Sequence, residues 1–170
     1  MAAPEGFKLE LLTPEHRRKR FSSGNPKVDE WLRQKALPAM KKNTSTTRVL
    51  VDAGGHVAGY YSLANTVLDI SLVPPELFAG QAPTRPPPTV TLAWLGIDAG
   101  FAGRGLGTYL FHQALADCVK AYDVIRYVAI IIDALDDDNV THYRSRGFTL
   151  VPGTTHKLYM AASVLQSVAG

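Results

Sequence analysis

The second half of the chain places a strand, a glycine-rich turn and a helix in direct succession, and this order limits the fold more than any other feature. The apolar run 90–98 predicts the strand, and apolar residues at helical spacing predict the helix over 104–121. The pattern then continues with a buried strand at 127–134, a helix at 137–146 and strands at 148–151 and 155–160. We therefore expect a mixed α/β fold with a single sheet flanked by helices.

The first half adds a helix and a hairpin to this sheet. Asn25-Pro26 is typical of an N-cap followed by proline at the first helical position, and the helix is expected to end or kink near Pro38. The β-rich runs 47–51 and 56–63 are joined by glycines and predict an antiparallel hairpin. Six of the eleven prolines fall between Pro74 and Pro88, which predicts a long extended loop between the halves.

The bulk properties agree with one globular domain. The chain has 170 residues, 46% of them hydrophobic and 19% charged, which is enough for one substantial core. Cys118 is the single cysteine, so no disulfide forms within the chain, and no apolar run is long enough to span a bilayer. We expect a soluble cytoplasmic protein without membrane contact. A net charge of +3 suits an anionic ligand or nucleic acid but decides nothing alone.

The glycine-rich turn Gly103-Arg104-Gly105-Leu106-Gly107 is the candidate ligand site. Backbone N–H groups without bulky side chains, added to the positive end of a helix dipole, form a site for a pyrophosphate. Glycine also serves tight turns that bind nothing, and the turn alone leaves both interpretations open. A Walker loop would need Gly-Lys-Ser/Thr, and a Rossmann fingerprint a different glycine spacing, so both nucleotide motifs are excluded.

Together with the strand before it and the helix after it, the segment 102–107 resembles the acetyl-coenzyme A motif of the GCN5-related N-acetyltransferase (GNAT) family. The resemblance implies a mixed, centrally splayed sheet and acetyl-CoA as co-substrate. Ala102 stands where the family usually has Arg or Gln, so the pyrophosphate contacts would come from the backbone. The implied cofactor-binding residues are Leu95, Gly96, Ile97, Gly103, Arg104, Gly105, Leu106, Gly107, Thr108 and Asn139.

Acetyl transfer from a thioester also requires a proton for the departing thiolate. The segment 139–148 is similar to the closing signature of the family, in which a tyrosine lies four residues before Gly-Phe; here that tyrosine is Tyr143. The resemblance therefore implies that Tyr143 is the catalytic acid. His142 is adjacent to it, and neighbouring helical positions do not share a face, so we interpret His142 as structural or exposed. No metal site is expected.

From about Phe21 to Met160 the chain resembles one branch of the family, the acetyltransferase toxins of bacterial toxin–antitoxin pairs of the TacT and AtaT type. The matching pieces are 21–25, 28–32, 59–64 and the proline-rich loop leading into 95–98. The chain departs from the branch at Ser23, where cysteine is common, and at Trp94, where arginine is common. The resemblance implies acetylation of the α-amine of aminoacyl-tRNA, inhibition of translation, a ribbon-helix-helix antitoxin and a homodimer.

The residues are compatible with this substrate. An α-amine has a pKa of about 8, against about 10.4 for lysine, so a strong protein base is dispensable. Asp98 is the only ionisable group in 89–100, and we assign it to fixing the turn. The basic run 16–20 is the densest in the chain, and surface runs of this kind are as often solvated as bound. The candidate substrate residues are Trp94, Arg85, Lys41, Lys42 and Arg144, with Tyr60 and Tyr61 as further stacking candidates.

Two other functions stay open at this point. One is an acetyltransferase for a small amine, an antibiotic or a protein N-terminus; the other is a binding module that holds acetyl-CoA without catalysis. For the domain organisation, we expect a basic N-terminal segment over 1–20, the acetyltransferase domain over 21–162 and a C-terminal tail over 163–170.

Overall fold

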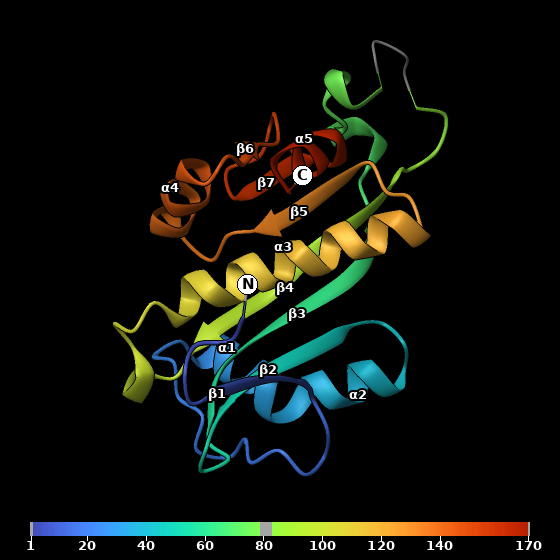
Figure 1. Ribbon diagram of the computed structural model, residues 1–170. Helices are drawn as coiled ribbons and strands as arrows, with labels where there is room; N and C mark the ends of the chain where they lie inside the picture. The colour runs from blue at the N-terminus through green and yellow to red at the C-terminus, as the bar shows by residue number, and fades with distance from the viewer. Residues whose placement is uncertain (1, 79–82, 170) are drawn as a thin grey trace. The chain divides into compact units, whose positions relative to one another are not determined.

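The computed structural model describes residues 2–78 and 83–169, and it is a mixed α/β structure (Figure 1). Backbone hydrogen bonds order its seven strands β1-β2-β3-β4-β5-β7-β6. The pairs β1–β2, β2–β3, β5–β7 and β6–β7 are antiparallel, whereas β4 and β5 are parallel. The expected class, a mixed sheet with helices, is confirmed. The chain divides into two compact units, which are described in turn.

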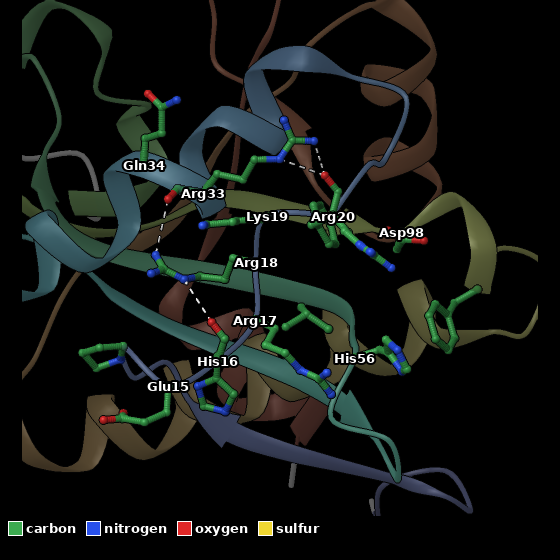
Figure 2. A pocket seen from close by; sticks show the side chains of 14 residues that line it. Glu15, His16, Arg17, Arg18, Lys19, Arg20, Arg33, Gln34, His56 and Asp98 are labelled. Atoms are coloured by element: carbon green, nitrogen blue, oxygen red, sulfur yellow. Dashed lines mark hydrogen bonds between the residues drawn. The ribbon is translucent and has the colours of Figure 1, made fainter.

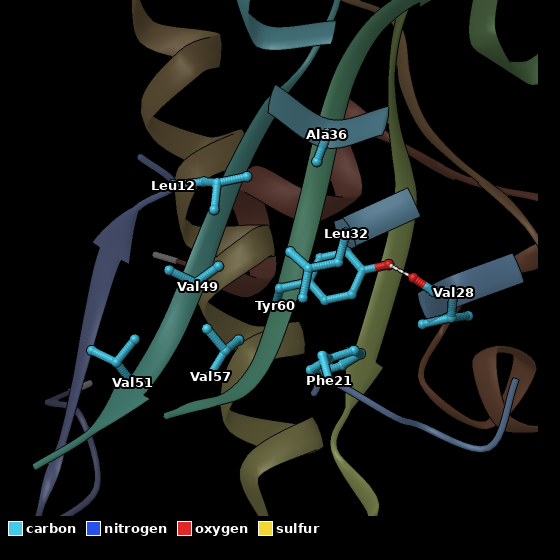
Figure 3. Close-up of a cluster of buried hydrophobic side chains, with 9 residues drawn as sticks. All are labelled: Leu12, Phe21, Val28, Leu32, Ala36, Val49, Val51, Val57 and Tyr60. Carbon is cyan, nitrogen blue, oxygen red and sulfur yellow. Dashed lines mark hydrogen bonds between the residues drawn. The ribbon is translucent and has the colours of Figure 1, made fainter. Parts of the chain in front are cut away.

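The first unit comprises residues 2–64 and 93–115. Its elements are β1 (Phe7–Leu11), α1 (Pro26–Glu30), the π-helical turn η1 (Trp31–Lys35), α2 (Ala36–Lys41), β2 (Thr46–Asp52), most of β3 (Val57–Val67), the end of β4 (Pro88–Ile97), the 3₁₀ turn η4 (Ala99–Phe101) and the start of α3 (Leu106–Val124). The predicted hairpin is confirmed as β2–β3. Nine buried hydrophobic residues form its core, among them Leu32, Val49 and Tyr60, each 0% exposed (Figure 3).

The N-terminal helical segment begins as expected but continues past its proline. The Asn25 side chain accepts hydrogen bonds from the N–H groups of Lys27 and Val28, which makes it the N-cap. The expectation of an end or kink near Pro38 is wrong, because α2 runs on to Lys41. The irregularity falls earlier, at η1, where the Ala36 N–H donates to Trp31 O instead of to the carbonyl four residues back.

The second unit comprises residues 65–92 and 116–169, without 79–82. Its own elements are the 3₁₀ turns η2 (Ile70–Leu72) and η3 (Pro75–Phe78), then β5 (Ala129–Asp133), α4 (Asp137–Ser145), β6 (Thr149–Leu150), β7 (Lys157–Ala161) and α5 (Ala162–Ala169). A buried cluster that includes Leu68, Ile131 and Val151 forms its core. β4 pairs with β5 from Thr89 to Leu92.

The proline-rich segment differs in part from the extended loop that was expected. Two short 3₁₀ turns lie within or beside it, and the Tyr159 hydroxyl donates to the Glu76 carboxylate in the second of them. Pro88 is the first residue of β4, a position that tolerates the missing N–H group. Residues 79–82 of the expected loop lie outside the described residues.

The two ends of the chain contain regular structure that the sequence pattern did not predict. The segment 1–20, expected to be a basic extension, contains β1, which pairs with β2 along its whole length. The segment 163–170, expected to be a tail, begins inside α5, and Leu165 is 2% exposed. Short edge strands and terminal helices carry weak patterns, because few of their residues are buried.

Among the described residues, no helix is long and apolar enough to cross a membrane. Within the same ranges, no group of three or more His, Cys, Asp or Glu side chains is arranged to hold a metal ion.

Candidate functional site

The carboxylate of Asp98 holds the turn that follows β4. Its Oδ1 accepts a hydrogen bond from the Gly100 N–H at 2.8 Å, and its Oδ2 accepts one from the Ser22 N–H at 3.0 Å. The Ala99 N–H in turn donates to Ser22 O at 2.8 Å. Asp98 therefore caps η4 and ties the turn to the loop before α1. This confirms that Asp98 fixes the turn.

The glycine-rich turn has the backbone that an anion site requires. Gly103 and Gly105 have φ angles of 77° and 74°, a region that L side chains rarely adopt. A Cβ at either position would meet no heavy atom within 4 Å, so both glycines face open space. Leu106, 2% exposed, anchors the start of α3, whose first N–H groups have no acceptor within the helix. The open turn and the helix start together fit a pyrophosphate.

Two further glycines allow close packing around β3 and β4. A Cβ on Gly96 would lie 2.4 Å from Val28 Cγ1, and one on Gly59 would lie 2.6 Å from Ile97 Cδ1. Neither position has room for a side chain. Leu95 and Ile97, on either side of Gly96, are half-buried. The Arg104 guanidinium lies 5.3 Å from the centre of the Phe101 ring, a cation–π distance.

Tyr143 lies in the second unit, near the end of α4. Asp136 caps this helix by accepting from the Asn139 N–H at 2.8 Å, and it also accepts from the Asn139 side-chain amide at 2.9 Å. The predicted cofactor contact at Asn139 would therefore come from a side chain already fixed at the helix start. Gly147, with φ 94°, ends the helix, and Phe148, 3% exposed, anchors the chain beyond it.

The surroundings of Tyr143 keep its hydroxyl protonated. Its ring meets the Phe148 ring edge to face at 6.2 Å. Burial raises the pKa of Tyr143 above its usual value near 10, and the charge of Arg146 offsets part of this rise. A proton donor is therefore present at neutral pH. His142 is exposed, which was one of the two expected alternatives. Partial desolvation of its ring and, to a smaller extent, the charge of Arg146 lower the pKa of His142, which favours the neutral imidazole.

The candidate substrate residues are in different situations. Trp94 stacks on Trp31, with ring centres 5.5 Å apart and planes 17° apart. Trp31, which no sequence motif singled out for this role, donates its indole N–H to Ser62 Oγ at 2.9 Å. The other four candidates, in contrast, have exposed side chains: Lys41, Lys42, Arg85 and Arg144. Tyr60 and Tyr61 are 0% and 1% exposed, so the suggestion that they stack on a nucleotide is wrong.

Solved structures share this architecture over nearly the whole chain. No family model matches the sequence. A structure of AtaTR bound with acetyl-CoA superposes with a TM-score of 0.85 at 22% identity, covering 98% of this chain and 100% of that one. AtaT complexed with acetyl-methionyl-tRNA gives 0.84 at 22% identity, over 96% and 99%. A tyrosine-to-phenylalanine variant of AtaT bound to the C-terminus of the antitoxin AtaR gives 0.80 at 21%, over 96% and 98%.

The chain thus has the fold of the AtaT structures. A curated relative is closer in sequence: the tRNA-acetylating toxin of Mycobacterium tuberculosis (strain ATCC 25618 / H37Rv) is 33% identical over 132 residues, which cover 78% of each chain. The chain belongs to the family of tRNA-acetylating toxins.

Proposed function

We propose that this protein transfers the acetyl group of acetyl-CoA to the α-amine of an aminoacyl-tRNA and thereby blocks translation. The observation that carries the proposal is the open turn at Gly103 and Gly105, which leads into the first N–H groups of α3 in a chain of this family. The similar toxins bound to acetyl-CoA and to acetyl-methionyl-tRNA support the choice of both substrates.

The coenzyme would be bound mainly by backbone groups. The N–H groups of residues 103–108 would hold the pyrophosphate, because Ala102 offers no side-chain donor at the head of the turn. Residues 95–97 at the end of β4, where Leu95 and Ile97 are half-buried, would line the path of the pantetheine arm, with their backbone next to the acetyl carbonyl. Acetyl-CoA supplies the activated acetyl group; the residues described here bind it, orient it and move protons.

Two proton transfers accompany the reaction. The attacking amine must be neutral, and an α-amine with a pKa of about 8 is partly neutral at pH 7 without a strong base. Asp98 is a poor candidate for such a base, since both of its oxygens already accept backbone N–H groups. Tyr143 would donate its hydroxyl proton to the departing thiolate, and the proton released by the attacking nitrogen would restore the hydroxyl group. The raised pKa of Tyr143 means that the hydroxyl group is protonated before the transfer.

Partners and location follow from this activity. An AtaT variant bound to the C-terminus of the antitoxin AtaR supports neutralisation by a ribbon-helix-helix antitoxin. The substrate is found where translation takes place, so we propose a cytoplasmic protein. We also propose that it is a homodimer, as the branch resemblance implies.

The activity is tested by incubating the protein with labelled acetyl-CoA and charged tRNA, deacylated tRNA or polyamines. We expect label on charged tRNA alone. Label on free amines with none on charged tRNA would instead identify a small-amine acetyltransferase.

The role of Tyr143 is tested with Tyr143→Phe, which removes only the hydroxyl group. Loss of a general acid lowers the rate about 10²- to 10⁴-fold, and we expect unchanged acetyl-CoA affinity and relief of growth arrest on expression. A chain that binds acetyl-CoA but shows no transfer before or after this change would be a binding module without catalysis.

A further inference from the structure

A cationic cavity of about 950 Å³ lies in the first unit (Figure 2). The loop 14–21 forms much of its wall, and the rest comes from Arg33 and Gln34 of the helical segment, His56 and Val57 at the start of β3, and Asp98 and Phe101 beyond β4. Phe101 also carries Arg104 of the glycine turn against its ring, so this cavity adjoins the turn. None of the roles proposed above uses it.

Its lining is strongly positive. Five arginine and lysine side chains face two carboxylates, those of Glu15 and Asp98. The Asp98 carboxylate accepts two backbone N–H groups, which offset part of its charge. Within the residues that the structure describes, Arg33 is the only one of the five cations with a carboxylate within 4 Å, and its distance to Asp29 is 4.0 Å.

Three of these cations are fixed in place by neutral acceptors. Arg17 donates to Gly54 O, Arg18 donates to Leu32 O and Arg33 O at 3.5 and 3.4 Å, and Arg33 Nε donates to Phe21 O at 3.0 Å. A carbonyl oxygen carries only a partial negative charge, so each guanidinium keeps most of its positive charge while it is held in place. These three guanidinium groups are therefore held in defined positions by the protein itself.

The two remaining cations are exposed and available. In the described part of the chain, the side chains of Lys19 and Arg20 make no hydrogen bond and no ion pair. Both line the cavity, directly after the fixed pair Arg17 and Arg18. Guanidinium groups held by hydrogen bonds, beside exposed cations without such bonds, form an arrangement suited to successive phosphates rather than to a single carboxylate.

We propose that this cavity binds backbone phosphates of the tRNA substrate, with Lys19 and Arg20 as the contacting residues. The inference rests on the proposed function and specifies where the tRNA is bound. The cavity has room for more than one phosphate, and the glycine turn already accounts for the coenzyme pyrophosphate, so the nucleic acid backbone is the better match. Arg17, Arg18 and Arg33 provide long-range charge and shape the wall.

The test is the double variant Lys19→Gln/Arg20→Gln, compared with Lys27→Gln/Lys120→Gln. The control removes the same charge from two exposed lysines outside the cavity lining. Affinity for deacylated tRNA is measured across a salt series, and affinity for acetyl-CoA is measured by calorimetry. Each lost phosphate contact reduces the slope of log K against log salt by about 0.7 to 0.9, so two contacts at 0.15 M salt weaken tRNA binding by about 15- to 30-fold.

We expect this loss, with its smaller salt slope, in the cavity variant alone, while acetyl-CoA affinity and the unfolding temperature stay unchanged. An unchanged tRNA affinity and slope would overturn the proposal, and so would an equal loss in the control. A loss of acetyl-CoA affinity alone would assign the cavity to the coenzyme and also overturn it. If the wild-type protein binds tRNA as described but acetylates no charged tRNA, the proposed function fails while the phosphate site stands.

Discussion

Replacing Gly105 by alanine isolates the backbone contribution to coenzyme binding. The new methyl group would meet no heavy atom of the protein within 4 Å, so in the free protein the cost arises from the φ angle of 74° alone. Holding an L residue in this region costs about 1–2 kcal/mol. A turn that relaxes to negative φ must recover this conformation on binding, which raises the Kd for acetyl-CoA by about 5- to 30-fold.

The matched control is Gly107→Ala, two residues further on. Gly107 is not among the glycines with positive φ, and its added Cβ would lie 3.6 Å from Ile97 Cγ1, an ordinary contact. Alanine keeps the backbone N–H group at this position and adds no φ strain, so we expect calorimetry to give a smaller loss of acetyl-CoA affinity than in Gly105→Ala, and a helix up to about 1 kcal/mol more stable. Equal losses in both variants, or wild-type affinity in Gly105→Ala, would refute the idea that the left-handed turn presents the N–H groups.

Three other changes test the surroundings of the site. Asp98→Asn keeps one of the two side-chain acceptors and replaces the other with an NH2 donor, so the turn loses one hydrogen bond and acetyl transfer should fall only a few fold; a loss of about 10²-fold or more would show that Asp98 is a general base. Tyr60→Phe removes the hydrogen bond to Val28 O (2.6 Å) and should lower the free energy of unfolding by about 1–3 kcal/mol in denaturant titrations. Burial raises the pKa of Cys118 to about 12, with a smaller effect from Asp117. The contribution of the protonated thiol to stability is therefore complete below the pKa of the unfolded chain, which is near 9, and is lost as the pH rises towards 12. Cys118→Ala should reduce the fall in the free energy of unfolding between about pH 9 and 10, which is at most about 1.4 kcal/mol per pH unit. Thermal unfolding measured across this pH range checks it, and an unchanged slope against pH would contradict the reasoning.

The sequence predicts the second half of the fold well, because its elements are long or strongly patterned. The strand–turn–helix order of the second half is present, and Asp98 fixes its turn; the hairpin of the first half is present as well. Tyr143 stays a prediction as the acid, and its raised pKa shows only that the hydroxyl group is protonated at neutral pH. The Gly-Phe that identified it has a physical explanation, since Gly147 ends the helix with positive φ and Phe148 anchors the next turn.

Other features depend on contacts that no local pattern contains. The stacking of Trp94 on Trp31 joins residues far apart in the sequence, as does the closing of the cationic cavity by Arg33. Tyr60 and Tyr61 follow the strand pattern, yet only the packed structure shows that both are buried. The expectation that the helix ends or kinks near Pro38 was wrong because the π-helical turn η1, which is wider than an α-helical turn, lies just before this residue.

That wide turn, η1, amounts to a one-residue insertion in an otherwise ordinary helix. Because the Ala36 N–H donates to Trp31 O, Leu32 O is left without its regular partner, and Arg18 takes its place. Deleting one residue from η1 would restore the regular partner, remove one of the carbonyl acceptors of Arg18 and turn the two ends of the helix by about 100° relative to each other. The length of this segment therefore couples the hydrophobic register of the helix to the charge of the neighbouring cavity, and a deletion there would change both together.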